Sequence, residues 1–324
     1  MALRIETRFG LPGLALPGLA LAGFALASLA ACAPVQAKIL QVGAAQEFKM
    51  PSAAVAAAQP GDTIHIAAGQ YFDCATVQQD RLTIEGDGAG SVMTDKACGG
   101  KALLVIAGHD VTVRNLTLQR ARVPDGNGAG IRAEGGNLTV DGVHFINNQD
   151  GILAGDSPAA TIRILRSEFV HNGSCQNSGG CAHGVYVGTL ALLHIERSRF
   201  YDTREGHGVK SKALRTEIID TSIEDGPDGT SSYLVDVPVG GSLLVDGSTL
   251  EKGPNCTNHG TAISVGEEGV SQPTAEIVVR NTKFTNDQRQ PTTLVRNLTA
   301  TEAKLSGNKL TGQVRPLEGD GSTR

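Results

Sequence analysis

A six-residue pattern recurs along most of the 324-residue chain and restricts the folds that the chain can adopt. Each copy begins with an aliphatic residue, continues with turn-forming or polar residues, and ends with Leu, Ile or Phe. The copies occupy residues 113–118, 140–145, 164–169, 195–200, 218–223, 245–250, 279–284 and 305–310, and a weaker copy begins at Ile84. Repeats at intervals of this length are typical of solenoids, propellers and arrays.

A second short aliphatic segment lies between successive copies. It occurs at Gly130-Ile131, Gly151-Ile152, Gly184-Val185, Gly208-Val209, Tyr233-Leu234 and Ala262-Ile263. The alternation within the copies has a period of two, which indicates strands. No long helical pattern separates them, which excludes a βαβ fold and a leucine-rich horseshoe, and a propeller blade needs roughly 40 residues. The repeats therefore predict an all-β, single-stranded parallel β-helix.

The composition excludes two other classes of protein. Hydrophobic residues make up 40% of the chain, which is too apolar for a disordered protein. The formal charge of −5 argues against a globally basic nucleic-acid binder, so we expect no nucleic-acid partner. The 41 glycines, with only 4% aromatic residues, favour many short strands and turns.

Residues 1–37 have the pattern of an export signal. Arg4 and Arg8 precede an uncharged apolar run over residues 9–31. Cleavage after Ala37 predicts a periplasmic or secreted protein. The alternative is a lipobox ending at Cys32, which would anchor the chain as a lipoprotein. In either case the mature chain contains no further segment that could span a membrane.

Export permits disulfides among the five cysteines that follow the signal. Two bridges are plausible, Cys74–Cys98 and Cys175–Cys181. Because five is an odd number, at least one cysteine stays unpaired or pairs with another chain. The sequence does not identify a partner for Cys256. A zinc site at Cys175, Cys181 and His183 is the rival interpretation, but no closely spaced cysteine pair supports it.

The start of the repeat region resembles a known superfamily. Residues 53–66, followed by Gly69-Gln70-Tyr71, resemble the entry of right-handed β-helix proteins of the pectate-lyase-like superfamily. The resemblance covers residues 40–312 and implies an N-terminal helix that caps the solenoid. We therefore expect a right-handed β-helix over residues 38–312, a disordered polar tail over 313–324, and a monomer. This fold hosts lyases, hydrolases, esterases, epimerases and adhesins.

The solenoid allows residues of neighbouring coils to be aligned, because equivalent positions stack about 4.8 Å apart. We align the second strands on Ile152, Val185, Val209, Leu234 and Ile263 as inward residues. The alignment places Asp150, His183 and His207 in one row, and Tyr186, Lys210 and Lys212 on the adjoining outer face. Such a cluster predicts a functional site, although each member alone has an ordinary structural explanation.

Local charge supports an anionic ligand at this site. Residues 193–215 contain six basic and three acidic residues in an otherwise acidic chain. An acidic polysaccharide is therefore the predicted partner, and β-elimination from a uronate requires a base, an acid and a group that neutralises the carboxylate. Lys210 is the candidate base, Tyr186 or His207 the acid, and Lys212 or Arg204 the carboxylate ligand. The remaining candidates for substrate binding are His183, Asp150, Tyr233 and Asp236.

A second resemblance concerns Val209-Lys210-Ser211. It is similar to the Lys-Ser segment of the lyase family that contains chondroitinase B and β-helical alginate lyases, in which the Lys is the catalytic base. The Arg that follows in that family has no counterpart in residues 232–238, and neither do its acidic calcium ligands. We predict no cofactor. Calcium at Glu224, Asp225 and Asp228 is the alternative to a plain turn.

Other functions use the same residues differently. Gly206-His207-Gly208 matches a short motif of β-helical polygalacturonases, but the Asp cluster that those hydrolases need is missing from the aligned row. A non-catalytic carbohydrate-binding or cell-envelope scaffold would use the groove without turnover. A C5-epimerase would remove the same proton without elimination. The leading prediction is an exported polysaccharide lyase.

Overall fold

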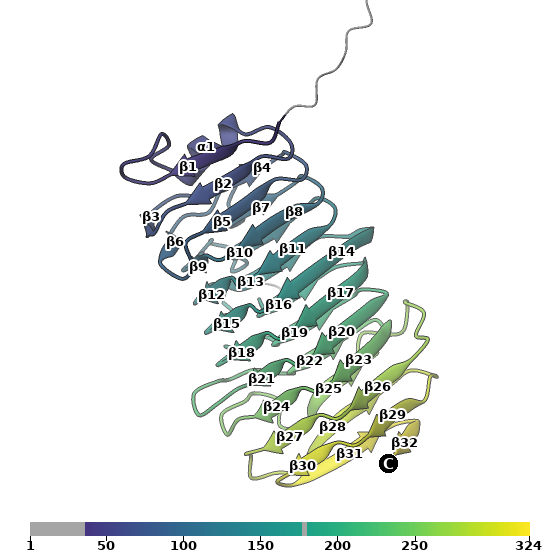
Figure 1. Cartoon of the computed structure of the whole chain (residues 1–324). Coiled ribbons are helices and arrows are strands. Elements are labelled where there is room, and N and C mark those ends of the chain that lie inside the picture. Colours follow the sequence, from purple (N-terminus) through teal and green to yellow (C-terminus); the bar gives the residue numbers. More distant parts are fainter. Residues whose placement is uncertain (1–35, 177–179) are drawn as a thin grey trace, which may run out of the picture. The chain divides into compact units, whose positions relative to one another are not determined.

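The computed structural model describes residues 36–176 and 180–324, and this part of the chain forms a right-handed parallel β-helix (Figure 1). Three parallel sheets, which we call A, B and C, run along the solenoid and confirm the predicted parallel β-helix. The predicted export signal, including Cys32, lies almost entirely in residues 1–35, outside the described residues.

Each complete coil contributes one strand to each sheet, and sheet A has one further strand at each end. Sheet A contains, in spatial order, β1 (Ile39–Val42), β2 (Thr63–Ile66), β5 (Thr83–Gly86), β8 (Val111–Arg114), β11 (Leu138–Asp141), β14 (Ser157–Leu165), β17 (Leu190–Glu196), β20 (Arg215–Ile219), β23 (Ser242–Asp246), β26 (Ile277–Arg280), β29 (Ala303–Ser306) and β32 (Gly321–Thr323). Sheet B contains β3 (Gly69–Tyr71), β6 (Ser91–Thr94), β9 (Thr117–Gln119), β12 (His144–Ile146), β15 (Glu168–Val170), β18 (Arg199–Tyr201), β21 (Ser222–Glu224), β24 (Thr249–Lys252), β27 (Lys283–Asn286) and β30 (Lys309–Thr311). Sheet C contains β4 (Ala75–Val77), β7 (Ala102–Ile106), β10 (Ala129–Ala133), β13 (Asp150–Ala154), β16 (Val185–Val187), β19 (Val209–Ser211), β22 (Val235–Val237), β25 (Thr261–Val265), β28 (Thr292–Asn297) and β31 (Val314–Glu318).

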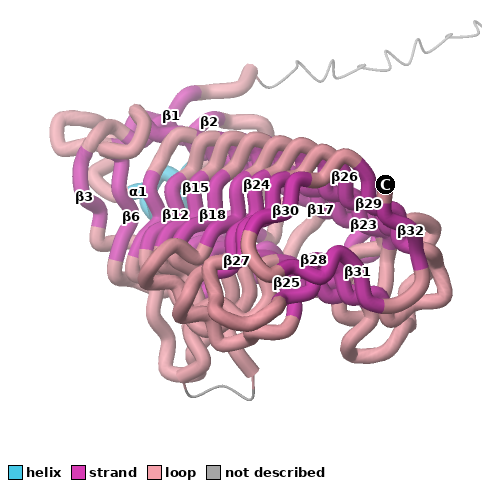
Figure 2. The backbone as a smooth tube through the Cα atoms, turned by 90° about the horizontal axis from the view of Figure 1, so that it is seen from below, coloured by secondary structure: helices cyan, strands magenta, loops and turns pink. Residues whose placement is uncertain are grey.

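The six-residue repeat forms the bend from sheet A to sheet B. Its third residue adopts a positive φ in each of the eight full copies, at Asn115, Gly142, Arg166, Arg197, Asp220, Gly247, Asn281 and Gly307. The fourth residue is often Ser or Thr, and its hydroxyl accepts a hydrogen bond from the backbone of the preceding coil, as Thr221 does from Ser198. These bends form a regular row along one edge of the solenoid (Figure 2).

The last residue of the repeat fills the core. Phe145, Phe169 and Phe200 are fully buried and stack with ring centroids 4.5 and 4.4 Å apart. Aliphatic side chains from all three sheets complete one continuous core along the solenoid. At the N-terminal end, α1 (Pro51–Ala57) packs on β1, β2 and β4 and buries Ala54 and Val55 (Figure 1).

Two details of the sequence-based fold were wrong. Residues 313–324 are not a disordered tail, because β31 and β32 extend sheets C and A there and Val314 and Leu317 pack on the core. The inward residue of β22 is Val235 and not Leu234, since Lys210 pairs with Asp236 across the strands. Leu234 and Val235 are both buried aliphatic residues, so hydrophobicity alone did not fix the register.

The cysteine predictions agree with the structure. Cys74–Cys98 and Cys175–Cys181 form disulfides, while Cys256 is buried and free within the described part of the chain. The second bridge uses both thiols that the rival zinc site would need. Among the described residues, no helix has the length and hydrophobicity needed to cross a membrane.

Candidate functional site

The outer face of sheet C carries a row of chemically distinctive side chains. Residues at equivalent positions of consecutive strands pair with one another, so their side chains point in the same direction. From β10 to β28 this row contains Arg132, Leu153, Tyr186, Lys210, Asp236, Ser264 and Arg296. The predicted pair Tyr186 and Lys210 is therefore adjacent, and the corrected register adds Asp236 beside Lys210.

A cavity of about 590 Å³ lies over the middle of this row. Its lining includes His183, Tyr186, His207, Lys210, Lys212 and Glu268, together with Cys175, Cys181, Glu205, Ser232 and Thr257 from surrounding loops. The loops that enter sheet C form one wall, and the turn after β25 supplies Glu268 from the opposite side. Four of the predicted catalytic residues thus share one cavity.

The two histidines belong to a hydrogen-bonded ladder. The backbone N–H of His183 donates to Asp150 Oδ1, that of His207 to His183 Nδ1, and that of Tyr233 to His207 Nδ1, at 2.7, 2.9 and 3.1 Å. The imidazoles stack with centroids 4.7 Å apart. Because each Nδ1 accepts a hydrogen bond, each neutral ring carries its proton on Nε2.

Burial keeps both imidazoles uncharged. It lowers the pKa of His183 well below its usual value, with a further contribution from His207 and Lys210. For His207, burial and the nearby cations Lys210 and Lys252 lower the pKa to about 3. Both rings are therefore neutral hydrogen-bond donors at neutral pH, and neither Nδ1 is available as a base.

Lys210 lies between two carboxylates. Its Nζ donates to Glu268 Oε1 at 2.6 Å and lies 3.7 Å from Asp236 Oδ2. Lys212 Nζ donates to the other oxygen of Glu268 at 2.8 Å. Burial alone would raise the pKa of Glu268, but the hydrogen bonds from both lysines outweigh it and lower that pKa to about 2.

Asp236 is in the opposite electrostatic situation. Only 2% of the residue is exposed, and its Oδ1 has no hydrogen-bond partner. Burial raises the pKa of Asp236 to about 7, although Lys210 opposes the shift. The site thus contains one carboxylate that is ionised throughout the physiological range and one that titrates near neutrality.

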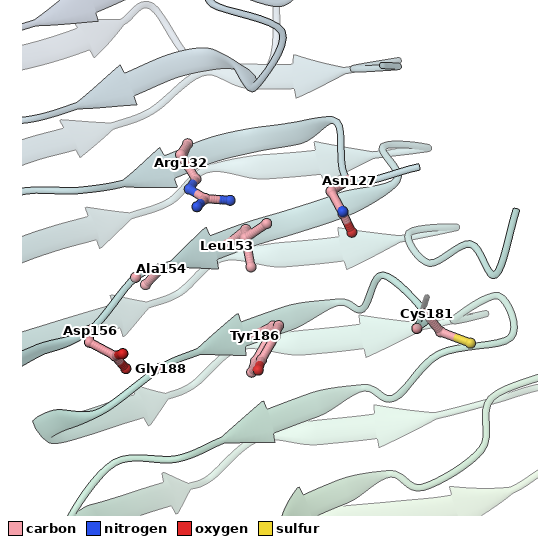
Figure 3. Close-up of a pocket in the computed structure, with 10 residues that line it drawn as sticks. Asn127, Arg132, Leu153, Ala154, Asp156, Cys181, Tyr186 and Gly188 are labelled. Atoms are coloured by element: carbon pink, nitrogen blue, oxygen red, sulfur yellow. The ribbon is translucent and has the colours of Figure 1, made fainter. Parts of the chain in front are cut away.

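Tyr186 lines the cavity and lies near both Lys210 and His183. Lys210 Nζ lies 5.6 Å from the centre of its ring, and the His183 ring meets it edge-on at 5.4 Å. Tyr186 also lines an adjoining cavity of about 410 Å³, together with Arg132, Leu153 and Asp156 (Figure 3). The two cavities share Gly180, Cys181 and Tyr186, so they form one groove along sheet C.

Some predicted residues lie elsewhere. Arg204 forms an ion pair with Asp202 and contacts His171 beside a separate cavity of about 320 Å³, so it does not reach the groove. Asp150 is 1% exposed and holds the backbone of His183. Tyr233 packs on His207 with ring centroids 5.2 Å apart, but it is not among the residues that line the cavity.

The basic segment 193–215 does not form one patch. Arg199 lies on sheet B beside Glu168, and Arg215 lies on sheet A between Glu217 and Glu276. Only Lys210 and Lys212 face the cavity. Arg204 pairs with Asp202 away from Lys210, and Glu268 compensates the charge of Lys212.

Sequence reasoning missed Glu268 and Thr257. Glu268 lies in the turn 266–269, two coils beyond Lys210, and the alignment of the second strands and the bends that enter them did not include it. The available signal was the pair of glycines that bracket Glu267 and Glu268 in a turn directly after an aligned strand. Gly266 and Gly269 have φ values of +92° and +93°.

The alternative calcium site is not assembled from its three candidate ligands. Asp225 is buried and lies 3.8 Å from Lys252 Nζ, while Asp228 is exposed. The third candidate, Glu224, receives a hydrogen bond from Ser222. The described residues contain no group of three or more His, Cys, Asp or Glu side chains arranged to hold a metal ion.

Comparisons with known proteins support the fold. No family model matches the sequence, and no curated protein matches it. The structure is similar to an alginate lyase from Paenibacillus sp. str. FPU-7, with a TM-score of 0.53 and 15% identity over 88% of this chain and 99% of that protein. It is also similar to AlyGC, a PL6 family alginate lyase, with a TM-score of 0.52 and 18% identity over 84% of this chain but 39% of that protein.

Proposed function

We propose that this chain is an exported lyase that cleaves uronate-containing polysaccharides by β-elimination in the cavity on sheet C. The observation that carries the proposal is the convergence of two ammonium groups, a phenol and a neutral imidazole on one cavity, at Lys210, Lys212, Tyr186 and His207. Both solved structures described above are alginate lyases with the same fold. At 15% and 18% identity, this structural similarity supports the fold alone. The case for the chemistry therefore rests on the residues of this chain.

The proposed reaction assigns each proton. Lys212 binds the substrate carboxylate, and the uncharged amine of Lys210 takes the C5 proton. The C4–O4 bond breaks as the C4=C5 double bond forms, and Tyr186 donates its phenolic proton to O4. His207 supplies a neutral Nε2–H donor beside the reacting groups. Lys210 donates a hydrogen bond to Glu268 in the free chain, so the proposed reaction begins with separation of these two groups and loss of one Lys210 proton to solvent.

The test measures unsaturated products directly. The purified mature chain is incubated with a panel of acidic polysaccharides while ultraviolet absorbance of unsaturated uronates is followed. We expect a rise with the wild type and a loss of roughly 100-fold or more in Lys210→Ala, because a positioned base contributes about that much. Lys304→Ala, an exposed lysine on sheet A, is the matched control. Activity that survives Lys210→Ala would exclude Lys210 as the base.

Glycoside hydrolysis is a second candidate, and one observation favours it. Asp236 and Glu268 lie on either side of Lys210, and their pKa values of about 7 and about 2 differ as those of an acid and a nucleophile or base do. Hydrolysis would release reducing ends without unsaturated products, and Asp236→Asn would abolish it. Binding without either product would indicate the non-catalytic scaffold.

A further inference from the structure

The carboxylate of Glu268 lies where an anionic ligand of the cavity would bind. Its two oxygens accept hydrogen bonds from Lys210 and Lys212 at 2.6 and 2.8 Å, one from each lysine. This is a bidentate arrangement, with one carboxylate held between two ammonium groups at the cavity surface. The carboxylate of a uronate has the same shape, charge and number of acceptor oxygens.

The backbone around Glu268 is fixed independently of these ion pairs. Its N–H donates to the carbonyl of Pro238 at 2.7 Å, and Gly269 N–H donates to Gly266 O at 3.1 Å. The next residues, Ser271 and Gln272, both donate to Val239 O. The Glu268 side chain is 42% exposed, so rotation about its own bonds can move the carboxylate into solvent without opening the turn.

Removal of this carboxylate would leave the cavity with excess positive charge. Lys210 and Lys212 are 14% and 27% exposed, and the remaining carboxyl groups are Asp236 beside Lys210 and Glu205 in the cavity lining, which accepts a hydrogen bond from the backbone of Cys175. Asp236 is largely buried behind Lys210 and titrates near neutrality, so it compensates the two cations only in part. An incoming anion restores the balance, whereas a neutral sugar does not.

We propose that Glu268 is an internal substitute for the substrate carboxylate: an anionic sugar displaces Glu268 from both lysines, its carboxylate binds Lys212, and Lys210 is left without this ion partner. This inference rests on the proposed function for its biological meaning, but it concerns binding and does not require turnover. It assigns the cavity to units that carry a carboxylate, and it makes Glu268 a residue that determines specificity by competition. A neutral sugar would have to break the ion pairs of Glu268 with Lys210 and Lys212 without forming new ion pairs in their place.

The test compares the affinities of two monosaccharide probes, D-glucuronate and D-glucose, by calorimetric titration. In Glu268→Gln we expect glucuronate to bind about fivefold or more tightly than in the wild type, the effect of losing the two competing ion pairs with Lys210 and Lys212. Glucose binding should not change. Glu267→Gln is the matched control, because the neighbouring Glu267 pairs with Arg296 and does not contact either lysine. Unchanged or weaker glucuronate binding by a folded Glu268→Gln variant would overturn the proposal.

A measurement on the unaltered chain keeps the proposal testable if that variant does not fold. Carboxyl carbon NMR follows the titration of Glu268 with and without saturating glucuronate. Displacement would move the pKa of Glu268 from about 2 towards its ordinary value, since both lysine hydrogen bonds would be lost. If the pKa of Glu268 is the same with and without saturating glucuronate, the proposal is contradicted. Displacement in a chain that releases no unsaturated product would contradict the lyase function alone.

Discussion

Sheets A and C share one architecture but treat their charged side chains differently. The outer face of sheet A carries ion pairs between neighbouring strands, such as Arg114–Glu85 and Arg280–Asp246, whose arginines are 46% and 48% exposed. On sheet C, Lys210 is 14% exposed and the Asp236 side chain 4%. Exposed pairs contribute little to stability, whereas buried charges are costly to maintain. Charged side chains that are kept buried despite this cost are typical of binding and catalytic sites.

The loops produce this difference. Sheet A leads into sheet B through the short bends of the six-residue repeat, which leave its outer face open. Sheet C is entered and left through longer loops, including residues 253–260 and 266–276, which precede and follow β25. Strand alternation therefore places charged side chains on the outer face of a sheet. The length of the adjoining loops determines whether that face is open to solvent or forms the base of a cavity.

The largest effect should come from Lys252, a buried charge at the end of β24 in sheet B whose ammonium group contacts the loop that carries Ser232 of the cavity lining. It is 0% exposed, donates to the carbonyl of Ser232, and lies 3.8 Å from Asp225 Oδ2. We expect Lys252→Met to lower the free energy of unfolding by roughly 3–5 kcal/mol, because it leaves a buried carboxyl group and carbonyls without their cation. Chemical denaturation measures the change. The double variant Lys252→Met with Asp225→Asn should recover part of it, and a loss below about 1 kcal/mol would break the contrast with sheet A.

An intermediate, pH-dependent effect is expected at Asp236. The pKa of Asp236 in the folded chain is about 7, well above the ordinary value of an aspartate, so the folded state binds the extra proton. Its contribution to stability is present at low pH and is lost as the pH rises from about 4 to 7. Asp236→Asn should reduce this fall by up to about 4 kcal/mol, the equivalent of roughly three pKa units.

Unfolding curves measured at several pH values test this expectation. Asp150 and Glu251, which also have pKa values of about 7, should continue to contribute in the variant with the same sign. The difference between the wild type and Asp236→Asn isolates Asp236. Parallel pH profiles for the two proteins would show that Asp236 is ionised in the folded chain well below pH 7.

The smallest effect is expected on sheet A. Arg280 Nη2 lies 2.7 Å from Asp246 Oδ2, but almost half of the arginine side chain is in solvent. We expect Arg280→Ala to change the free energy of unfolding by less than about 1 kcal/mol and to leave glucuronate binding unaltered. A larger loss of stability would mean that the open face of sheet A also depends on its charges.

The sequence predicted the solenoid because its repeat encodes both a bend and a core position. The third residue of each copy needs a positive φ, which favours Gly and Asn, and the sixth supplies a Leu, Ile or Phe to the stack. Tyr186, Lys210 and the two histidines could be aligned for the same reason. The register failed at Leu234, where two adjacent aliphatic residues are both buried.

The rest of the site could not be predicted because loops do not follow the repeat. Glu268 reaches the lysines from a turn two coils away, and Arg204 turns from the groove towards Asp202. Both outcomes depend on side-chain direction in irregular segments of variable length. Local charge counting over residues 193–215 therefore overestimated the positive surface, since neighbouring coils supplied the compensating acids.

The parallel stacking of sheet C has a consequence for how this chain can change in evolution. Lys210 faces outward only because Val209 and Ser211 face inward in the same three-residue strand. An insertion or deletion of one residue there would send Lys210 into the core and remove the site in a single event. Gain or loss of a whole coil between the N-terminal helix and β10 would preserve the contacts of the site, because the residues that line its cavity belong to later coils. Such a change would alter only the length of the solenoid, so solenoid length and site chemistry are free to vary independently among descendants of this sequence.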